Sequence, residues 1–278
     1  MKTRIISAAV GILLFVAILL LSTGLVLSNG GYPIIMSFAL SALAAVGTYE
    51  ILHNTSIVKN NIITAVACSF SFMAVLTFSH LSLTLGILFY FIYVAAVFTV
   101  SLFIHDKTNP AELAAAQSYP LFIAFGFSSI NLIINEYGLF FFLLIFIFAW
   151  ASDTFAYFTG VFFGKHKLCP ALSPKKTIEG AIGGIVGCVG CTVLAFYLFN
   201  MSKEPVVIVG FALLSVLFSV LGMVGDISAS YIKRAAGIKD YGNLMPGHGG
   251  VLDRFDSVLL IAPVFYAALY VLPFLVKG

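Results

Sequence analysis

The sequence predicts an all-α fold, a polytopic bundle of about nine transmembrane helices whose N-terminus faces the cytoplasm. Of its 278 residues, 61% are hydrophobic and only 9% are charged. Soluble globular proteins are roughly half apolar and about a quarter charged. Because one helical crossing takes about 20 mostly apolar residues, the chain has room for about eight to ten crossings and for no large soluble domain.

Apolar runs between polar breaks give the positions of the crossings. The first run, after Lys2 and Arg4, is longer than the roughly 7–15 residues of a signal-peptide core, so an uncleaved crossing is favoured over a secretory signal. A count of eight remains the alternative, because the fifth run is short and the break between the third and fourth is weak. The predicted spans are 5–27, 33–52, 62–79, 82–104, 118–134, 138–160, 177–199, 205–232 and 255–276.

The basic residues support this count, since cytoplasmic loops of membrane proteins carry an excess of Lys and Arg. With nine spans, only Lys203 and Lys277 of the fourteen basic residues fall outside. The pattern predicts a multi-pass protein of the cell's inner (plasma) membrane whose functional loops face the cytoplasm. The residues on the predicted inner side are Lys2, Arg4, Lys59, Lys107, Lys165, Lys167, Lys175, Lys176, Lys233, Arg234, Lys239 and Arg254.

Two long cytoplasmic loops, 161–176 and 233–254, divide the chain by function. Both are rich in Lys, Gly and Pro, and long loops commonly carry function. We expect residues 1–134 to form a scaffold of transmembrane helices that gives lipids access. Residues 135–278 are expected to form the catalytic region.

Four acidic residues lie inside or at the edge of predicted spans, where ionisable side chains are costly and commonly functional. They are Glu50, Asp153, Glu179 and Asp226, all toward the predicted cytoplasmic side. Because they share this side, they can share one water-accessible cavity.

Asp226 stands out because Ser230 and Lys233 follow it at i+4 and i+7 on the same helix face. A carboxylate and an ammonium group therefore line one stripe. An ion pair between Asp226 and Lys233 is the alternative, but the two are about 10 Å apart along the helix axis. A ligand-binding role for Asp226 is favoured.

The loop 237–250 holds five glycines, which let backbone N–H groups approach phosphate oxygens closely. Asp253 and Asp256 follow at i and i+3 on one face of the next helix's first turn. Beside so many basic residues, this pair indicates a magnesium site, although helix capping is the alternative. His248 in the loop is either a general base, a phosphate hydrogen-bond donor or a structural residue.

The other long loop ends with Ser173, Lys175, Lys176 and Thr177 at a predicted helix start, a pattern that suits phosphate binding. The lysines are explained equally well by the charge asymmetry of the membrane. The glycines at 180, 183, 184 and 187 predict close helix packing. Cys188 and Cys191 are expected to be small packing residues, because a zinc site needs four ligands.

The stretch 230–256, SYIKRAAGIKDYGNLMPGHGGVLDRFD, closely resembles the signature of the phosphatidate cytidylyltransferases. Met245 is its one departure, where Leu, Ile or Phe is usual. SPKKTIEG at 173–180 and the Ser152-Asp153 pair are similar to a second conserved region of that family. The resemblance implies transfer of the cytidylyl group of CTP to phosphatidic acid, which gives CDP-diacylglycerol and pyrophosphate and requires Mg²⁺.

The resemblance also implies a set of site residues. The metal ligands would be Asp226, Asp253 and Asp256. The phosphates would be held by Lys233, Arg234, Lys239 and Arg254, with His248 completing the catalytic group. The remaining substrate-binding residues would be Ser173, Lys176, Thr177, Ser230, Gly249 and Gly250. Asp153 and Glu179 would bind a second cation or orient lysines.

Two other functions remain open at this point. A related lipid-phosphate cytidylyltransferase or a polyprenol kinase would use the same loop, and an ion-coupled transporter would use the acids inside the spans. The expected partners are membrane lipids and the two substrates, and a homodimer is compatible with the small residues of the spans. The sequence shows no aromatic platform of the kind that binds nucleic acids, so a nucleic-acid partner is not expected.

Overall fold

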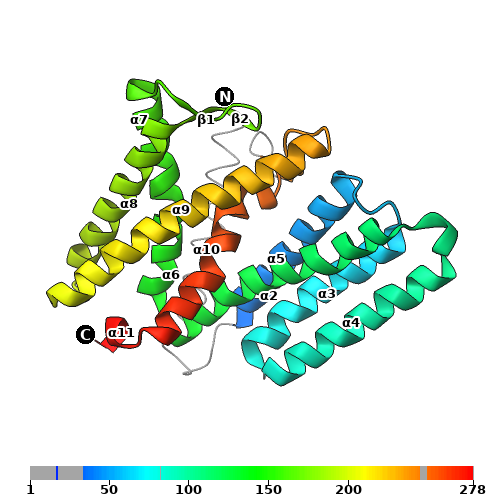
Figure 1. Cartoon of the computed structure of the whole chain (residues 1–278). Coiled ribbons are helices and arrows are strands. Elements are labelled where there is room, and N and C mark those ends of the chain that lie inside the picture. Colours follow the sequence, from blue (N-terminus) through cyan, green and yellow to red (C-terminus); the bar gives the residue numbers. More distant parts are fainter. Residues whose placement is uncertain (1–16, 18–33, 82, 245–248, 278) are drawn as a thin grey trace. The chain divides into compact units, whose positions relative to one another are not determined.

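The computed structural model describes residues 17, 34–81, 83–244 and 249–277, and these are almost entirely helical (Figure 1). The chain forms two compact units, each built from two stretches of sequence. The first comprises residues 1–131 and 235–255, and the second comprises 132–234 and 256–278. The predicted functional division at residue 134 stays a prediction.

The described helices of the first unit are long and apolar. Asn60 begins one of them by accepting hydrogen bonds from the backbone N–H groups of Ile62 and Ile63, at 2.8 and 3.2 Å. Inside the unit Phe70 stacks on Tyr93 with ring centroids 4.0 Å apart. The elements are α2 (Ile34–Tyr49), the π-helical turn η1 (Glu50–Asn54), α3 (Asn61–His80), α4 (Leu83–Phe103), the short η2 (His105–Lys107) and most of α5 (Pro110–Glu136).

The second unit packs its helices around aromatic side chains. Phe148, Phe218 and Phe265 are fully buried, and their ring centroids lie 4.9 to 5.1 Å apart. The elements are α6 (Leu139–Phe146), the π-helical turn η3 (Ile147–Ala151), α7 (Ser152–Phe163), β1 (Lys167–Cys169), β2 (Ser173–Thr177), α8 (Ile178–Leu198), nearly all of α9 (Pro205–Ala235), most of α10 (Leu252–Val271) and α11 (Phe274–Lys277).

Eight of the described helical segments are long and apolar enough to cross a membrane, so the chain is a multi-pass membrane protein. They match eight of the nine predicted spans, and the predicted first span, 5–27, lies outside the described residues. The weak break between the third and fourth spans is real, since α3 ends at His80 and α4 begins at Leu83. The short fifth run belongs to a longer helix, Pro110–Glu136.

The prediction that the glycines of α8 serve helix packing is confirmed. A Cβ atom at Gly180 would lie 2.7 Å from the carbonyl oxygen of Ala156, and one at Gly184 would lie 2.8 Å from that of Ser152. The backbones of α7 and α8 therefore approach too closely for any larger residue. Cys188 is also a packing residue, a buried free thiol whose Sγ lies 3.6 Å from the carbonyl oxygen of Ser215.

The loop 161–176, which is predicted to be cytoplasmic, is more regular than expected. It contains an antiparallel hairpin in which Lys167 pairs with Thr177 and Cys169 pairs with Ser173. The all-α prediction is otherwise confirmed in the described residues. The hairpin matters for function because its second strand leads directly into α8.

We predict that Gly184→Ala destabilises the protein while Gly190→Ala, on the same helix, does not. A Cβ at Gly184 would meet the Ser152 carbonyl, whereas one at Gly190 meets nothing within 4 Å. Overpacking costs about 1–3 kcal/mol, and replacing an unpacked helical glycine by alanine gains up to about 1 kcal/mol. Thermal unfolding in detergent measures both variants, and equal midpoints would contradict close α7–α8 packing.

Candidate functional site

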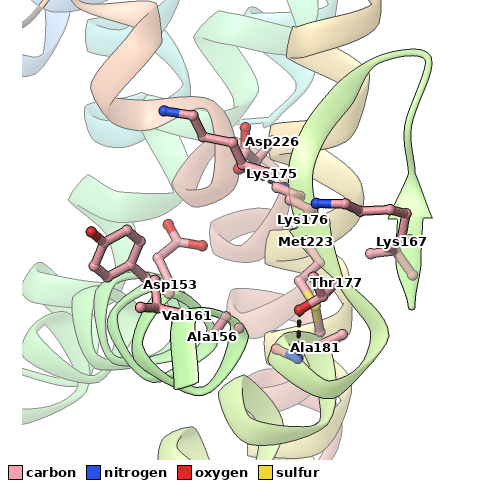
Figure 2. Close-up of a pocket in the computed structure, with 14 residues that line it drawn as sticks. Asp153, Ala156, Val161, Lys167, Lys175, Lys176, Thr177, Ala181, Met223 and Asp226 are labelled. Atoms are coloured by element: carbon pink, nitrogen blue, oxygen red, sulfur yellow. Dashed lines mark hydrogen bonds and ion pairs between the residues drawn. The ribbon is translucent and has the colours of Figure 1, made fainter. Parts of the chain in front are cut away.

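The second unit contains a pocket of about 640 Å³ between α7, the hairpin, the start of α8 and α9 (Figure 2). Its polar lining combines two acids, Asp153 and Asp226, with the lysines at 167, 175 and 176. Much of the remaining wall is apolar. It includes Tyr157, Val161, Leu168 and Met223. The pocket therefore presents both charged groups and an apolar surface to a single ligand.

An ion pair crosses this pocket from the hairpin to a membrane helix. The Nζ atom of Lys176, on β2, lies 2.6 Å from the Oδ2 atom of Asp226, on α9. Both side chains are only about one quarter exposed, 24% and 28%. An ion pair shielded in this way is less weakened by water and salt than one on an open surface.

The partner of Asp226 differs from the one considered from the sequence. Lys233 was weighed as an ion-pair partner and judged too distant along α9. The close partner is Lys176, which is contributed by another element. Helix spacing gives no sign of this contact, because a lysine on the hairpin reaches the acid only after the chain has folded.

The carboxyl group of Asp256 lies near that of Asp226. Asp256 on α10 interacts electrostatically with Asp226, Asp153 and Lys233. Lys233 is buried, with 8% of its surface exposed. The three carboxyl groups thus lie near two ammonium groups, those of Lys176 and Lys233.

This acidic cluster, Asp153, Asp226 and Asp256, suits a divalent cation that is shared with substrate. No group of three or more His, Cys, Asp or Glu side chains among the described residues converges closely enough to hold a metal ion alone. Magnesium, however, commonly takes one or two carboxylates and completes its shell with water and substrate phosphates. The carboxylate donors fit an ion bound in that way.

The start of α8 is fixed by two side chains that the sequence had linked to substrate or metal. Thr177 is buried, and its Oγ1 accepts a hydrogen bond of 3.1 Å from the N–H of Gly180, which caps the helix. Glu179 accepts hydrogen bonds from the backbone N–H groups of Lys165 and His166, at 3.1 and 3.2 Å. These contacts hold the hairpin against α8.

His166 has no partner at a regular spacing in the sequence, but the structure pairs it with Glu179. Its Nδ1 atom lies 2.6 Å from the Oε1 atom of Glu179. The two residues are thirteen positions apart across the hairpin. No regular spacing in the sequence reveals such a pair, because the hairpin itself was not predicted.

In the first unit, Asp253 holds the glycine-rich loop. Its Oδ2 atom accepts hydrogen bonds from the N–H groups of Tyr241 and Gly250, at 2.8 and 2.9 Å. Gly249 beside it has a φ of +86°, a conformation that side chains disfavour. His248 lies outside the described residues. The predicted metal-binding role of Asp253 stays a prediction.

Glu50 has a partner that its position in the sequence does not suggest. Its Oε1 and Oε2 atoms accept hydrogen bonds of 2.9 Å from the N–H groups of Val251 and Leu252. Of the four acids expected to share a cavity, only Asp153 and Asp226 line the described pocket. Glu50 belongs to the first unit, and Glu179 serves the hairpin.

The other predicted site residues lie elsewhere on the described chain. Ser173 begins β2 and is half-buried, and Ser230 is half-buried on α9. Three basic residues are exposed near the ends of α9 and α10, namely Arg234, Lys239 and Arg254. None of these residues lines the pocket. Two further lysines do line the pocket: Lys167, to which the sequence gave no substrate role, and Lys175, for which it left phosphate binding and membrane topology as equal explanations.

The sequence of this chain is similar to those of known proteins. The model of the cytidylyltransferase family matches residues 2–272. The phosphatidate cytidylyltransferase of Haemophilus influenzae is 46% identical over 133 residues, 46% of this chain and 45% of that protein. That of Bacillus subtilis is 41% identical over 133 residues, 48% of each chain.

A third relative, the phosphatidate cytidylyltransferase of Staphylococcus haemolyticus, is 43% identical over 129 residues, 46% of this chain and 48% of its own. In each case the chain spans about half the length of the relative that it matches. The family model covers nearly all of the sequence. The chain therefore belongs to the cytidylyltransferase family.

Proposed function

We propose that this protein transfers the cytidylyl group of CTP to phosphatidic acid, giving CDP-diacylglycerol and pyrophosphate, at the cytoplasmic face of the inner membrane. The observation that carries the proposal is the pocket of the second unit, where lysines and carboxylates meet an apolar wall. The names of the relatives support the same substrates. A ligand with a polyanionic head and a lipid tail suits such a pocket.

The reaction makes a simple demand on the protein. A phosphate oxygen of phosphatidic acid forms a bond to the α-phosphorus of CTP, and the bond from that phosphorus to the bridging oxygen breaks to release pyrophosphate. Both reactants are polyanions, so positive charge must hold them together. The attacking phosphate is already ionised near neutral pH, so no strong general base is required.

The lysines of the hairpin supply this charge in our proposal. Lys167 and Lys175 line the pocket with Lys176, whose ammonium group is oriented by Asp226. Because this ammonium group is already held in place, binding a phosphate costs less side-chain entropy. The apolar wall near Tyr157 lets phosphatidic acid enter from the inner leaflet while its acyl chains stay in lipid.

A divalent cation is common in the family, and we propose that Mg²⁺ binds at the acidic cluster through Asp226 and Asp256. When bound, the ion neutralises charge on the transferring phosphoryl group. Asp153 then balances the charge of the neighbouring lysine, or binds a second cation. The roles assigned from the sequence remain part of the proposal: metal binding by Asp253, catalysis by His248 in the glycine-rich loop, and phosphate binding by Lys233, Arg234, Lys239 and Arg254. We also propose that the protein forms a homodimer.

We predict that the purified protein converts CTP and phosphatidic acid into CDP-diacylglycerol and that EDTA abolishes the reaction. CTP labelled at the α-phosphorus should place its label in the lipid product, and CTP labelled at the γ-phosphorus should not. The opposite labelling would identify a lipid kinase. Ion uptake into proteoliposomes without CTP would favour a transporter.

We predict that Asp226→Asn lowers kcat by about a hundredfold or more, because Lys176 loses its partner and the cation loses a ligand. The matched control is Glu136→Gln in the same unit, where the acid accepts a hydrogen bond from Tyr266. This control removes one negative charge without touching the pocket. Similar losses in both variants, with both proteins folded, would rule out the role of Asp226.

We predict that Lys175→Met raises KM for one of the two substrates about tenfold and changes kcat little, because a charged hydrogen bond to a phosphate is lost. Lys203→Met is the matched control, since Lys203 is exposed and does not line the pocket. Steady-state kinetics with each substrate varied in turn show which phosphate Lys175 binds. An unchanged KM for both substrates removes Lys175 from the site.

A further inference from the structure

Glu50 is a buried carboxylate whose hydrogen bonds reach across most of the sequence. It is 3% exposed and begins the π-helical turn η1. Its two carboxylate oxygens accept hydrogen bonds from the N–H groups of Val251 and Leu252, which lie 201 and 202 residues later in the sequence. Among the described residues no ion pair involves Glu50. Its charge is therefore balanced by backbone N–H groups.

The two N–H groups lie at the beginning of α10, where helical residues have no partner of their own. A carboxylate satisfies these donors and interacts favourably with the positive end of the helix dipole. Glu50 thus caps α10 from a different helix. This contact fixes where the glycine-rich loop ends.

Two glycines of the loop leave room for this carboxylate. At both Gly242 and Gly250, the three atoms nearest to an added Cβ all belong to Glu50. Neither glycine is among those with positive φ in the described chain. Glycine is therefore needed at these positions because a larger side chain would collide with Glu50, and not because the backbone has an unusual conformation.

Other side chains hold the same loop. The Nδ2 atom of Asn54, at the end of η1, donates a hydrogen bond of 2.7 Å to the carbonyl oxygen of Tyr241. The N–H of Tyr241 donates to Asp253 at 2.8 Å. The beginning of the loop at Tyr241 and its end at Gly250 to Leu252 are thus both held by side chains.

We propose that Glu50 is a positioning residue whose carboxylate, and not a substrate phosphate, fills the space beside Gly242 and Gly250 and fixes the two described ends of the glycine-rich loop. Its consequence for turnover rests on the proposed function, because only that function gives the loop a part in the reaction. The effect on loop conformation does not rest on it.

The test is a double-mutant cycle of Glu50→Ala and Gly242→Ala, read by hydrogen–deuterium exchange of the peptide 241–252 and by kcat. Alone, Gly242→Ala should speed exchange about tenfold and lower kcat by a similar factor, because its methyl group displaces the carboxylate. In the Glu50→Ala background the methyl group has room, so Gly242→Ala should add nothing. An equal effect in both backgrounds would overturn the proposal.

Two further variants keep the test decisive. Glu50→Gln preserves size but presents an amide NH₂ group to one of the N–H donors, so exchange of 241–252 should again be about tenfold faster. Exchange equal to that of the unchanged protein would also overturn the proposal. Glu112→Gln, a buried acid of the same unit that contacts Asn109, is the control and should leave exchange and kcat unchanged.

Exchange and turnover separate this proposal from the proposed function. A non-additive exchange cycle in a protein that makes no CDP-diacylglycerol would establish the role of Glu50 and refute the function. An active protein with an additive exchange cycle would refute the role of Glu50 alone.

Discussion

The structure depends on a constraint that the bilayer imposes. A charge or a backbone N–H group inside the helix bundle must find its partner within the chain, because lipid provides none. Lys176 meets Asp226 in the second unit, and Glu50 meets the beginning of α10 in the first. Both acids stand out in the sequence because they are costly. In each case the partner offsets the free-energy cost of burying the charge, and the identity of the partner shows which part of the fold the acid holds in place.

The membrane-spanning helices could be located from the sequence because length and hydrophobicity are enough to identify them. Apolar length located the eight described spans, and the glycines of α8 indicated close helix packing, for which the structure supplies α7 as the partner. The hairpin was missed, since its strands are short and polar and lack the alternation that marks a buried strand. The Glu179–His166 pair was missed with it.

The candidate site was predictable in its residue types and less so in its pairings. Asp226 and Lys176 were both singled out from the sequence, and the structure brings them together. Their contact depends on tertiary folding, which no spacing along one helix can show. Lys167 was overlooked as a pocket residue, and Lys175 was left undecided, because membrane topology already explains lysines in a loop that is predicted to be cytoplasmic.

Glycine serves two purposes in this chain that look alike in the sequence. In α8 it allows two backbones to touch, with the Ser152 carbonyl occupying the place of a side chain at Gly184. At Gly242 that place is occupied by the carboxylate of Glu50. A glycine-rich stretch beside a phosphate-binding signature is therefore not evidence that every glycine faces phosphate.

The contact between Glu50 and α10 has a consequence for how the protein is made. Ribosomes add about 5–20 residues per second, so the roughly 200 residues between Glu50 and its partners take about 10–40 seconds to synthesise. During that time Glu50 has already been synthesised, while the N–H groups to which it binds do not yet exist. The first unit is thus finished only after most of the second has been translated, and a chain that ends before residue 251 lacks the hydrogen-bond donors of Glu50.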